Sequence, residues 1–302
     1  MPVPPAQLAI LASLTKPKGV SVLASENGLP YEAAYKAVRE SEKRGIVATH
    51  REGRALVTSC RSALAPQLAR SLIFDSPRQD WGRVFHGQRP TLLRVLDKVG
   101  EPELAAVVCG KSRSLVYHAI KTHAPRGLLI RKGGTYAINP RLTVLRSLLE
   151  ELDRVEAAHR LHELEPDARV AWSLGPEILF ASRKRLAGPR VQLAALSRFS
   201  EYGLDFITGE ATTYCIAKRR LDAADAIFQT LIVGSGSSVN RSYCALLYEK
   251  AKPAEFERKS KIYGLEAEAR ALMRYVQTHE ATEGFLPWRE HERYREQYGV
   301  ST

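Results

Sequence analysis

The stretch that decides the fold of this chain is residues 100–138, GEPELAAVVCGKSRSLVYHAIKTHAPRGLLIRKGGTYAI. Pro102 suits the first turn of a helix, and the apolar residues after it predict a helix that runs to Val108. Cys109-Gly110-Lys111 then predicts a tight turn, and Ser112 is a residue type that caps helix N-termini. We therefore expect two short helices joined by a turn.

The helix expected after Ser112 has two unlike faces. We expect four apolar residues to pack inward: Leu115, Val116, Ala119 and Ile120. We expect five polar or aromatic residues to face outward: Arg113, Ser114, Tyr117, His118 and Lys121. Arginine can bind O6 and N7 of guanine, and Ser or Tyr can hold a phosphate, so the outward face suits DNA. The alternative is a solvated helix face without a role.

A hairpin with a basic tip is predicted after this helix. Pro125 and Gly127 end the helix, and residues 128–130 and 135–138 read as strands around Arg131-Lys132-Gly133-Gly134. A further helix is expected before the stretch, at residues 91–99. Three helices and a hairpin are the outline of a winged helix, in which the third helix enters the major groove and the hairpin lies along the DNA backbone.

The same outline is predicted earlier in the chain. Leu8, Leu11 and Leu14 predict a first helix, residues 20–25 a second, and Pro30 begins a third that runs to about residue 44. Ala34 and Val38 are expected to face inward, and Tyr31, Tyr35, Lys36 and Arg39 outward. Residues 46–50 and 55–58 then predict a hairpin whose tip carries Arg51 and Arg54. The repetition favours two modules in tandem.

Between the modules lies a connector that carries Trp81 and Phe85. We expect it to pack against the hairpins and fix the modules relative to each other, because an exposed linker rarely holds large aromatic residues. A long helix is predicted over residues 140–164, with Leu145, Leu148, Leu152 and Val155 at coiled-coil spacing. This seam fits a dimer contact or docking on a neighbouring domain equally well.

Residues 167–302 have mixed patterning. Strands are expected at residues 170–173, 178–181 and 203–208, residues 191–199 could be strand or helix, and helices are expected at 221–233, 241–249, 253–262 and 265–278. The predicted class is α+β, with two winged-helix modules in tandem and a mixed α/β C-terminal domain. The predicted domains are 1–75, 76–145, a linker or dimerisation helix at 146–166, and 167–302.

The charge of this 302-residue chain is divided unevenly. Residues 1–150 hold 23 Lys and Arg against 11 Asp and Glu, whereas residues 151–302 hold 22 of each kind. An excess confined to one half favours a polyanionic partner, although a solubilising surface would look the same.

The remaining composition is that of an ordinary globular protein, with 44% hydrophobic and 26% charged residues. No apolar stretch is long enough to cross a bilayer, and the first residues do not resemble a signal peptide. The four cysteines lie far apart, which favours a reducing cytoplasm with buried thiols over a redox sensor.

Several motifs carry a family resemblance. Asn27-Gly28-Leu29-Pro30-Tyr31, Glu42-Lys43-Arg44-Gly45-Ile46-Val47 and Gly110-Lys111-Ser112-Arg113-Ser114 resemble MarR-type winged-helix modules of archaeal transcriptional regulators. The resemblance covers about residues 6–145 and implies a DNA-binding regulator. The C-terminal half, with Trp172-Ser173-Leu174-Gly175-Pro176-Glu177, is similar to a domain of such regulators and, distantly, to the nucleotidyltransferase-like fold of AbiE-type antitoxins.

Two residues depart from the family pattern. Ser41 stands where these modules usually have a core Leu, and Glu32 near the start of the third helix would repel phosphate. We therefore expect the second module to carry more of the sequence specificity.

The candidate DNA-binding residues lie on the two third helices, on the turn before the second of them, and on the hairpin tips. They are Tyr35, Lys36, Arg39, Arg51, Arg54, Lys111, Ser112, Arg113, Ser114, Tyr117, His118, Lys121, Arg131 and Lys132.

No catalytic or metal site is predicted. A nucleotidyl-transferring site needs two carboxylates one residue apart, and Asp205, Asp222 and Asp225 do not form such a pair. His159 and His162 could ligate a metal, but two histidines at a helix end are more often solvated. We expect no cofactor and no enzymatic activity.

The favoured hypothesis is a cytoplasmic, sequence-specific double-stranded DNA-binding transcriptional regulator. A homodimer is expected, with a possible protein or small-molecule partner at the C-terminal domain. One alternative is an antitoxin-type or nucleotidyltransferase-like protein whose C-terminal half binds a toxin or nucleotide. Another is an architectural chromatin protein that covers DNA without sequence preference.

Overall fold

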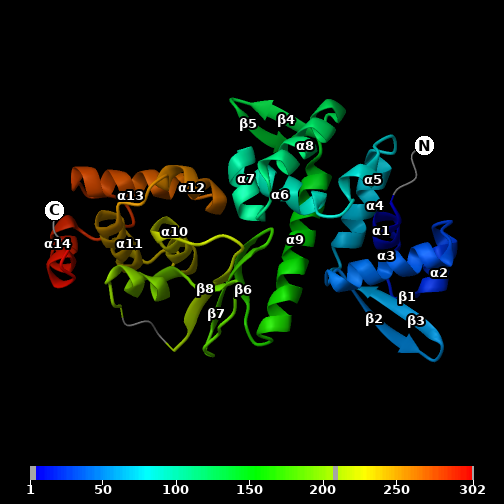
Figure 1. Cartoon of the computed structure of the whole chain (residues 1–302), viewed down its shortest axis with the longest axis horizontal. Helices are drawn as coiled ribbons and strands as arrows, with labels where there is room; N and C mark the ends of the chain where they lie inside the picture. The colour runs from blue at the N-terminus through cyan, green and yellow to red at the C-terminus, as the bar shows by residue number, and fades with distance from the viewer. Residues whose placement is uncertain (1–4, 207–209, 301–302) are drawn as a thin grey trace. The chain divides into compact units, whose positions relative to one another are not determined.

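The structure is a computed structural model that describes residues 5–206 and 210–300 (Figure 1). It has two compact units, Met1–Pro166 and Asp167–Thr302, so the division falls where the sequence places its main boundary. Helices make up 55% of the structure and strands 14%, which agrees with the α+β class.

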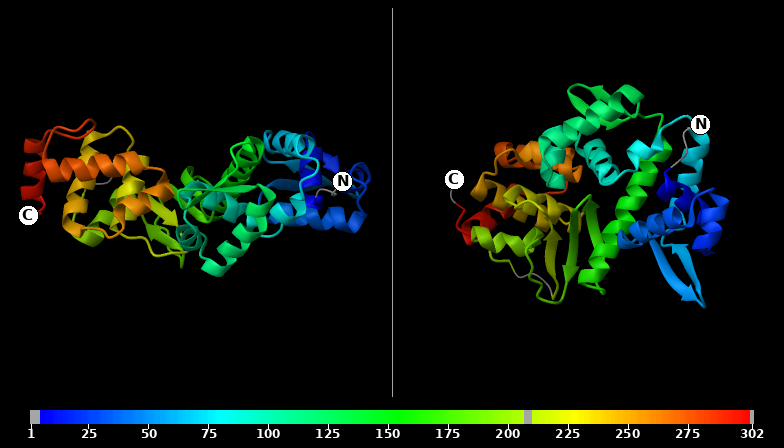
Figure 2. Two further views of the ribbon diagram at one scale, coloured as in Figure 1. Left: turned by 90° about the horizontal axis from the view of Figure 1, so that it is seen from above. Right: turned by 45° about the vertical axis from the view of Figure 1, so that its right-hand side comes forward.

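The first unit contains two similar series of three helices and a hairpin. The first series is α1 (Ala6–Ser13), α2 (Val20–Glu26), α3 (Tyr31–Lys43), β2 (Val47–Glu52) and β3 (Ala55–Cys60), with the short β1 (Lys18–Gly19) paired to β3. The second series is α6 (Arg89–Val99), α7 (Pro102–Cys109), α8 (Arg113–His123), β4 (Leu129–Lys132) and β5 (Thr135–Ile138). These elements confirm the helices and hairpins predicted for residues 1–138. The β2–β3 hairpin projects from the helices of its own series (Figure 2).

The two series have equivalent positions from the turn before the third helix through that helix. Gly28 and Gly110 follow α2 and α7, and both have positive φ, 61° and 59°. Each lies the same number of positions before a partly exposed tyrosine, Tyr35 on α3 or Tyr117 on α8. The sequence therefore uses a glycine at the same point of each turn, where φ is positive.

The third helix of each series buries equivalent positions. The buried residues of α3 are Ala34, Ala37, Val38 and Ser41. The buried residues of α8 are Val116, Ala119, Ile120 and His123. Their spacing of three, one and three residues makes a single stripe on a helix. Ser41 faces the core as predicted, and His123 takes the same place in the second series.

The long helix α9 (Thr143–Leu164) packs against helices that belong to both series. It contacts α4 (Ala65–Asp75), which follows the first hairpin, and α6 of the second series (Figure 1). Its predicted seam is buried: Leu145, Leu148, Leu152 and Val155. The docking alternative is confirmed, and these side chains are not free to form a dimer seam.

The connector between the two series is ordered around two aromatic residues. Trp81 begins the short α5 (Trp81–Val84), and the rings of Trp81 and Phe85 meet edge to face with centroids 6.3 Å apart. Both side chains are buried. Their burial agrees with the expectation that the connector is packed rather than solvated.

The second unit is an antiparallel sheet with helices. The strands, in the order β6-β7-β9-β8, are β6 (Val170–Leu174), β7 (Glu177–Ser182), β9 (Thr212–Ile216) and β8 (Val191–Leu193). The helices are α10 (Ala223–Val233), α11 (Ser238–Ala251), α12 (Phe256–Tyr263), α13 (Glu266–Thr278) and α14 (Trp288–Gln297). One core cluster of this unit joins Leu179 of β7, Cys215 of β9 and Leu221.

The strand predicted at residues 203–208 is wrong for the residues that the structure describes. Ala195–Tyr202 is a 3₁₀ helix that ends at Gly203, with φ of 69°, and residues 203–206 are not a strand. Residues 207 and 208 lie outside the described residues. The strand that fills the sheet is β9, which the sequence analysis did not predict, and α14 was also not predicted.

Candidate nucleic-acid interface

The N-terminus of α8 is fixed by its own sequence. Gly110 adopts a left-handed conformation at the end of α7, and the Lys111 amide donates to the Ala106 carbonyl at 2.9 Å. Ser112 caps α8 as predicted, because its hydroxyl accepts a hydrogen bond from the Leu115 amide at 3.3 Å. The turn therefore sets the direction in which the first residues of α8 point.

The outward face of α8 is positively charged and free of acidic residues. Arg113, Ser114, Tyr117, His118 and Lys121 are all exposed, as predicted. No Asp or Glu lies on α8, and within the described residues neither Arg113 nor Lys121 forms an ion pair. The charges on this face are available to an anionic ligand.

The prediction that Leu115 packs inward is wrong, since 45% of its surface is exposed. The buried stripe of α8 begins one residue later, at Val116, and continues through His123. A step of one residue turns a helix by about 100°, so Leu115 falls on the exposed side.

His123 was not singled out by the sequence analysis, and it is fully buried. Burial lowers the pKa of its imidazole to about 4, with smaller effects from Arg89 and Arg126. Among the described residues neither ring nitrogen has a hydrogen-bond partner. The imidazole is therefore neutral near pH 7, which both its burial and the nearby arginines favour.

The hydroxyl of Tyr117 is held by a neighbouring helix. It donates a hydrogen bond to a carboxylate oxygen of Glu103 on α7 at 2.7 Å, and this bond raises the pKa of Tyr117. The residue as a whole is 40% exposed. The hydroxyl of Tyr117 is therefore already engaged by Glu103, while part of the residue remains exposed.

The two hairpin tips carry exposed cations without ion-pair partners in the described part of the chain: Arg51, Arg54, Arg131 and Lys132. Gly133 and Gly134 both have positive φ, 56° and 86°, which is the geometry of a tight two-residue hairpin turn. The guanidinium of Arg131 also lies 5.7 Å from the ring centroid of Tyr136 across the hairpin.

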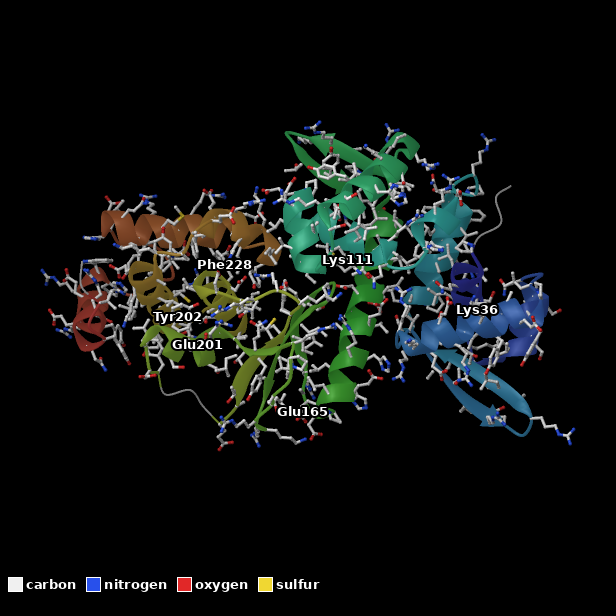
Figure 3. All side chains as sticks on the ribbon, viewed as in Figure 1. Lys36, Lys111, Glu165, Glu201, Tyr202 and Phe228 are labelled. Carbon is white, nitrogen blue, oxygen red and sulfur yellow. The ribbon has the colours of Figure 1, made fainter. Side chains whose placement is uncertain are left out.

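The corresponding face of α3 is less suited to an anion. Arg39 donates to a Glu42 carboxylate oxygen at 2.6 Å and lies 5.3 Å from the ring centroid of Tyr35. Its hydrogen bonds with Tyr35 and Glu42 raise the pKa of Arg39. Lys36 remains exposed and has no ion pair in the described residues. Lys111, in the turn before α8, is half-buried; Figure 3 labels both lysines. Glu32, Glu40 and Glu42 balance the three basic residues of α3, so its helix is neutral overall.

Polar contacts along α9 hold both series in place. Glu156 accepts hydrogen bonds from Arg44, which follows α3. On the same helix Arg146 pairs with Asp97 of α6 through its Nε at 2.8 Å, and a carboxylate oxygen of Asp97 accepts the Ile138 amide at the end of β5 at 2.7 Å. The second hairpin is thus tied to α6 and α9 together.

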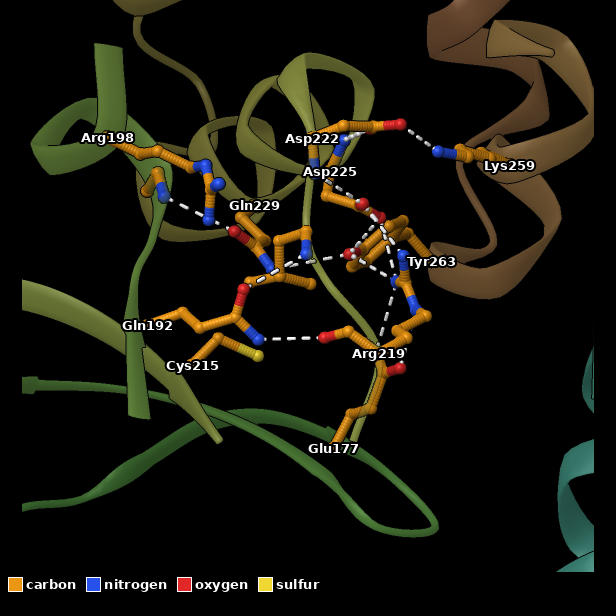
Figure 4. A network of polar contacts seen from close by, with 12 residues as sticks. Glu177, Gln192, Arg198, Cys215, Arg219, Asp222, Asp225, Gln229, Lys259 and Tyr263 are labelled. Carbon is orange, nitrogen blue, oxygen red and sulfur yellow. Dashed lines mark hydrogen bonds and ion pairs between the residues drawn. The ribbon is translucent and has the colours of Figure 1, made fainter. Parts of the chain in front are cut away.

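The second unit contains a buried network of charges around Arg219, drawn in Figure 4. The guanidinium donates to Glu177 at 2.7 and 3.2 Å and to Asp225 at 2.7 and 2.7 Å. Tyr263 donates its hydroxyl proton to Asp225 at 2.9 Å, and Gln229 donates to the Tyr263 oxygen at 3.3 Å. Both carboxylates are fully buried.

The two carboxyl groups of this network differ in their acidity. Burial raises the pKa of Glu177, and Arg219 offsets only part of that effect. Burial also acts to raise the pKa of Asp225, but the Arg219 guanidinium outweighs it and the pKa is lowered. Two carboxylates around one guanidinium carry a net negative charge, so Glu177 is the group that accepts a proton first.

Two of the carboxylates weighed as catalytic candidates, Asp222 and Asp225, have structural partners. Asp222 caps α10 in a capping box with Asp225 and forms an ion pair with Lys259. His159, one of the two histidines weighed as metal ligands, packs where a side chain at Gly45 would lie. In the described ranges no group of three or more His, Cys, Asp or Glu residues is arranged to hold a metal ion.

None of the four cysteines, which all lie within the described residues, forms a disulfide with another. Burial raises the pKa of Cys60, Cys215 and Cys244, which disfavours the reactive thiolate at these positions.

Part of the second unit matches a known protein family. Residues 189–300 match a family model described as HVO_2833_C, C-terminal. No curated protein matches the chain. The match lies within the second unit and covers less than half of the chain. In residues 5–206 and 210–300, no helix combines the length and hydropathy needed to span a bilayer.

Proposed function

We propose that the chain is a sequence-specific double-stranded DNA-binding transcriptional regulator, and that its first unit is two winged-helix modules in tandem. The observation that carries the proposal is the outer face of α8, where Arg113 and Lys121 are exposed on a capped helix without acidic residues. A basic hairpin follows directly, as in modules that place a helix in the major groove.

The two parts of the second module have different roles in this proposal. Arg113, in the first turn of α8, contacts base edges, since the N-terminal residues of a recognition helix reach the bases. Arg131 and Lys132 at the hairpin tip contact phosphates, which adds affinity for any sequence. The first module contributes phosphate contacts through Arg51 and Arg54, because α3 has no net charge.

A homodimer remains part of the proposal, with two half-sites about one helical turn of DNA apart, roughly 34 Å. The buried α9 seam is excluded as its interface. The second unit would then supply the dimer contact or bind a protein or small-molecule partner.

Two substitutions in the second module test the assignment. In Arg113→Ala, the affinity for a selected site should fall by about 1–3 kcal/mol while the affinity for a shuffled duplex changes little. In Arg131→Ala, both affinities should fall alike, and the slope of log K against log salt should flatten by about 0.9. Lys98→Ala, an exposed cation on α6, is the matched control and should leave both affinities unchanged. Equal, sequence-independent decreases in Arg113→Ala and Arg131→Ala would contradict the assignment.

A further inference from the structure

Two short segments of the second unit are strongly basic although residues 151–302 have no net charge. The loop between β7 and β8 contains Arg183-Lys184-Arg185 and Arg190, and the segment after β9 contains Lys218-Arg219-Arg220. The β7–β8 loop contains no acidic residue, and the segment after β9 contains one, Asp222, directly before α10. The other balancing acidic residues lie elsewhere, so the overall neutrality conceals a local excess.

A hydrogen bond brings the end of the β7–β8 loop beside the segment after β9, whereas the loop starts at the other end of β9, where Ser182 pairs with Thr212. The Ala217 amide donates to the Arg190 carbonyl at 3.0 Å, which places Arg190 beside the basic segment after β9. The Gln192 side chain donates to the Arg219 carbonyl at 2.8 Å and accepts from the Leu221 amide at 3.0 Å. These bonds fix the backbone on both sides of Arg220.

The buried network decides which of the three consecutive basic residues reach the surface. Arg219 turns inward onto Glu177 and Asp225 (Figure 4), and only 10% of its side chain is exposed. Lys218 and Arg220, on either side of it, are exposed. The ion pairs of Arg219 therefore anchor this segment, while the side chains of Lys218 and Arg220 stay exposed.

The β7–β8 loop is also attached to the sheet. The Leu186 amide donates to the Tyr214 hydroxyl oxygen at 3.2 Å, and Tyr214 is a buried residue of β9. Arg185 precedes this contact directly and is exposed. Arg185 thus lies on a loop that is tied to β9 at Leu186 and again at Arg190.

Three arginines on these segments have no ion-pair partner among the described residues: Arg185, Arg190 and Arg220. Two other basic residues of the β7–β8 loop do form ion pairs: Arg183 with Glu210 at 3.4 Å and Lys184 with Asp167 at 3.8 Å. The described part of both segments also lacks large exposed apolar side chains. Free guanidinium groups without apolar neighbours suit phosphates better than an apolar protein surface or a membrane interior.

We propose that Arg185, Arg190, Lys218 and Arg220 form a second phosphate-binding surface that contacts duplex DNA outside the bases read by α8. The inference rests on the proposed function and extends it to the second unit. It assigns that unit a sequence-independent role in affinity, whereas sequence recognition stays with the first unit.

The test removes the three unpaired charges from the full chain in Arg185→Gln/Arg190→Gln/Arg220→Gln. The matched control, Arg270→Gln/Arg289→Gln/Arg293→Gln, removes three exposed arginines elsewhere in the second unit. Binding is measured between 50 and 200 mM salt, on the selected site alone and on the same site within a long duplex. The thermal midpoint of each variant shows whether it is folded.

On the long duplex, the slope of log K against log salt should flatten by about 0.9 for each phosphate that is no longer neutralised, and by about 2–3 in all. The selected motif should stay the same, and the control should match the wild type. An unchanged slope in the folded triple variant would overturn the inference while leaving the proposed function intact. Loss of binding to anionic phospholipid vesicles with an unchanged DNA slope would also overturn it. A wild-type chain that binds no duplex would overturn both proposals.

Discussion

Replacing Arg219 with Met tests how the second unit is held together. The substitution keeps an unbranched side chain of similar reach but removes the guanidinium that faces Glu177 and Asp225. Both carboxyl groups are fully buried, so each would lose its counter-charge where water cannot replace it. Breaking a buried ion pair by removing one partner costs about 3–5 kcal/mol.

The expected loss for Arg219→Met lies at the upper end of this range, about 4–5 kcal/mol, because one guanidinium serves two carboxyl groups. For a unit of this size, a loss of 1 kcal/mol lowers the thermal midpoint by about 2–4 °C, so the midpoint should fall by about 8–20 °C. Differential scanning calorimetry of the full chain, with urea unfolding followed by circular dichroism, measures both quantities.

Two further variants separate the roles of the carboxyl groups. Glu177→Gln should cost less than Asp225→Asn, because the raised pKa of Glu177 makes it the more readily protonated of the two carboxyl groups. Asp225→Asn should cost more, since the lowered pKa of Asp225 reflects a carboxylate that the folded state stabilises. If Arg219→Met destabilised the unit by less than about 1 kcal/mol, or if Glu177→Gln cost more than Asp225→Asn, the description of the network would be wrong.

The pH dependence of these variants has a defined sign. A carboxyl group with a raised folded pKa binds more protons in the folded state, so its contribution to stability falls as pH rises above its ordinary value, 4.5 for Glu177. In Arg219→Met, Asp225 acquires this behaviour and the raised pKa of Glu177 rises further, because the guanidinium that lowers both pKa values is gone. The loss of stability should therefore be larger at pH 7 than at pH 5.

Three smaller predictions concern the first unit. Ser112→Ala removes the α8 cap and should cost about 1 kcal/mol by urea unfolding, whereas Ser112→Asp should retain most of that stability. Because the pKa of His123 is lowered in the folded state, the folded wild type binds fewer protons than the unfolded chain and should lose stability as pH falls from 6.5 toward 4. His123→Leu should abolish this loss. Thermal midpoints of wild type and variant that change in parallel with pH would contradict the prediction. Asp97→Ala should cost about 2–3 kcal/mol and increase hydrogen exchange at the Ile138 amide, because that amide and Arg146 lose a shared acceptor; unchanged exchange would contradict this role.

The first unit is largely predictable from its sequence because its turns and helix ends are set by residues close together in the chain. Gly28 and Gly110 mark the turns, Ser112 marks a helix start, and the apolar spacing of α3 and α8 gives the buried faces. Leu115 was misplaced because four apolar residues lie within one and a half turns of α8, and spacing alone does not decide which of them packs inward.

The second unit depends more on contacts between distant segments. β8 has three residues and is followed at once by a 3₁₀ helix, so residues 191–199 carry two patterns within one window. In the network, Arg219 contacts Glu177, 42 positions earlier in the chain, and Tyr263, 44 positions later. No local sequence pattern reveals contacts over such separations. A signal was present in retrospect, because Glu177 borders the apolar strand β7 and Asp225 interrupts the apolar run of α10.

The most direct test of the account is selection of bound fragments from sheared genomic DNA by the purified full chain, at a low and a physiological salt concentration. The account predicts one enriched motif at physiological salt, with footprints of defined edges, and weaker enrichment against a background of nonspecific binding at low salt. Recovery of DNA without any enriched sequence at either salt concentration would contradict sequence-specific recognition by α8, and recovery of no DNA would contradict DNA binding altogether.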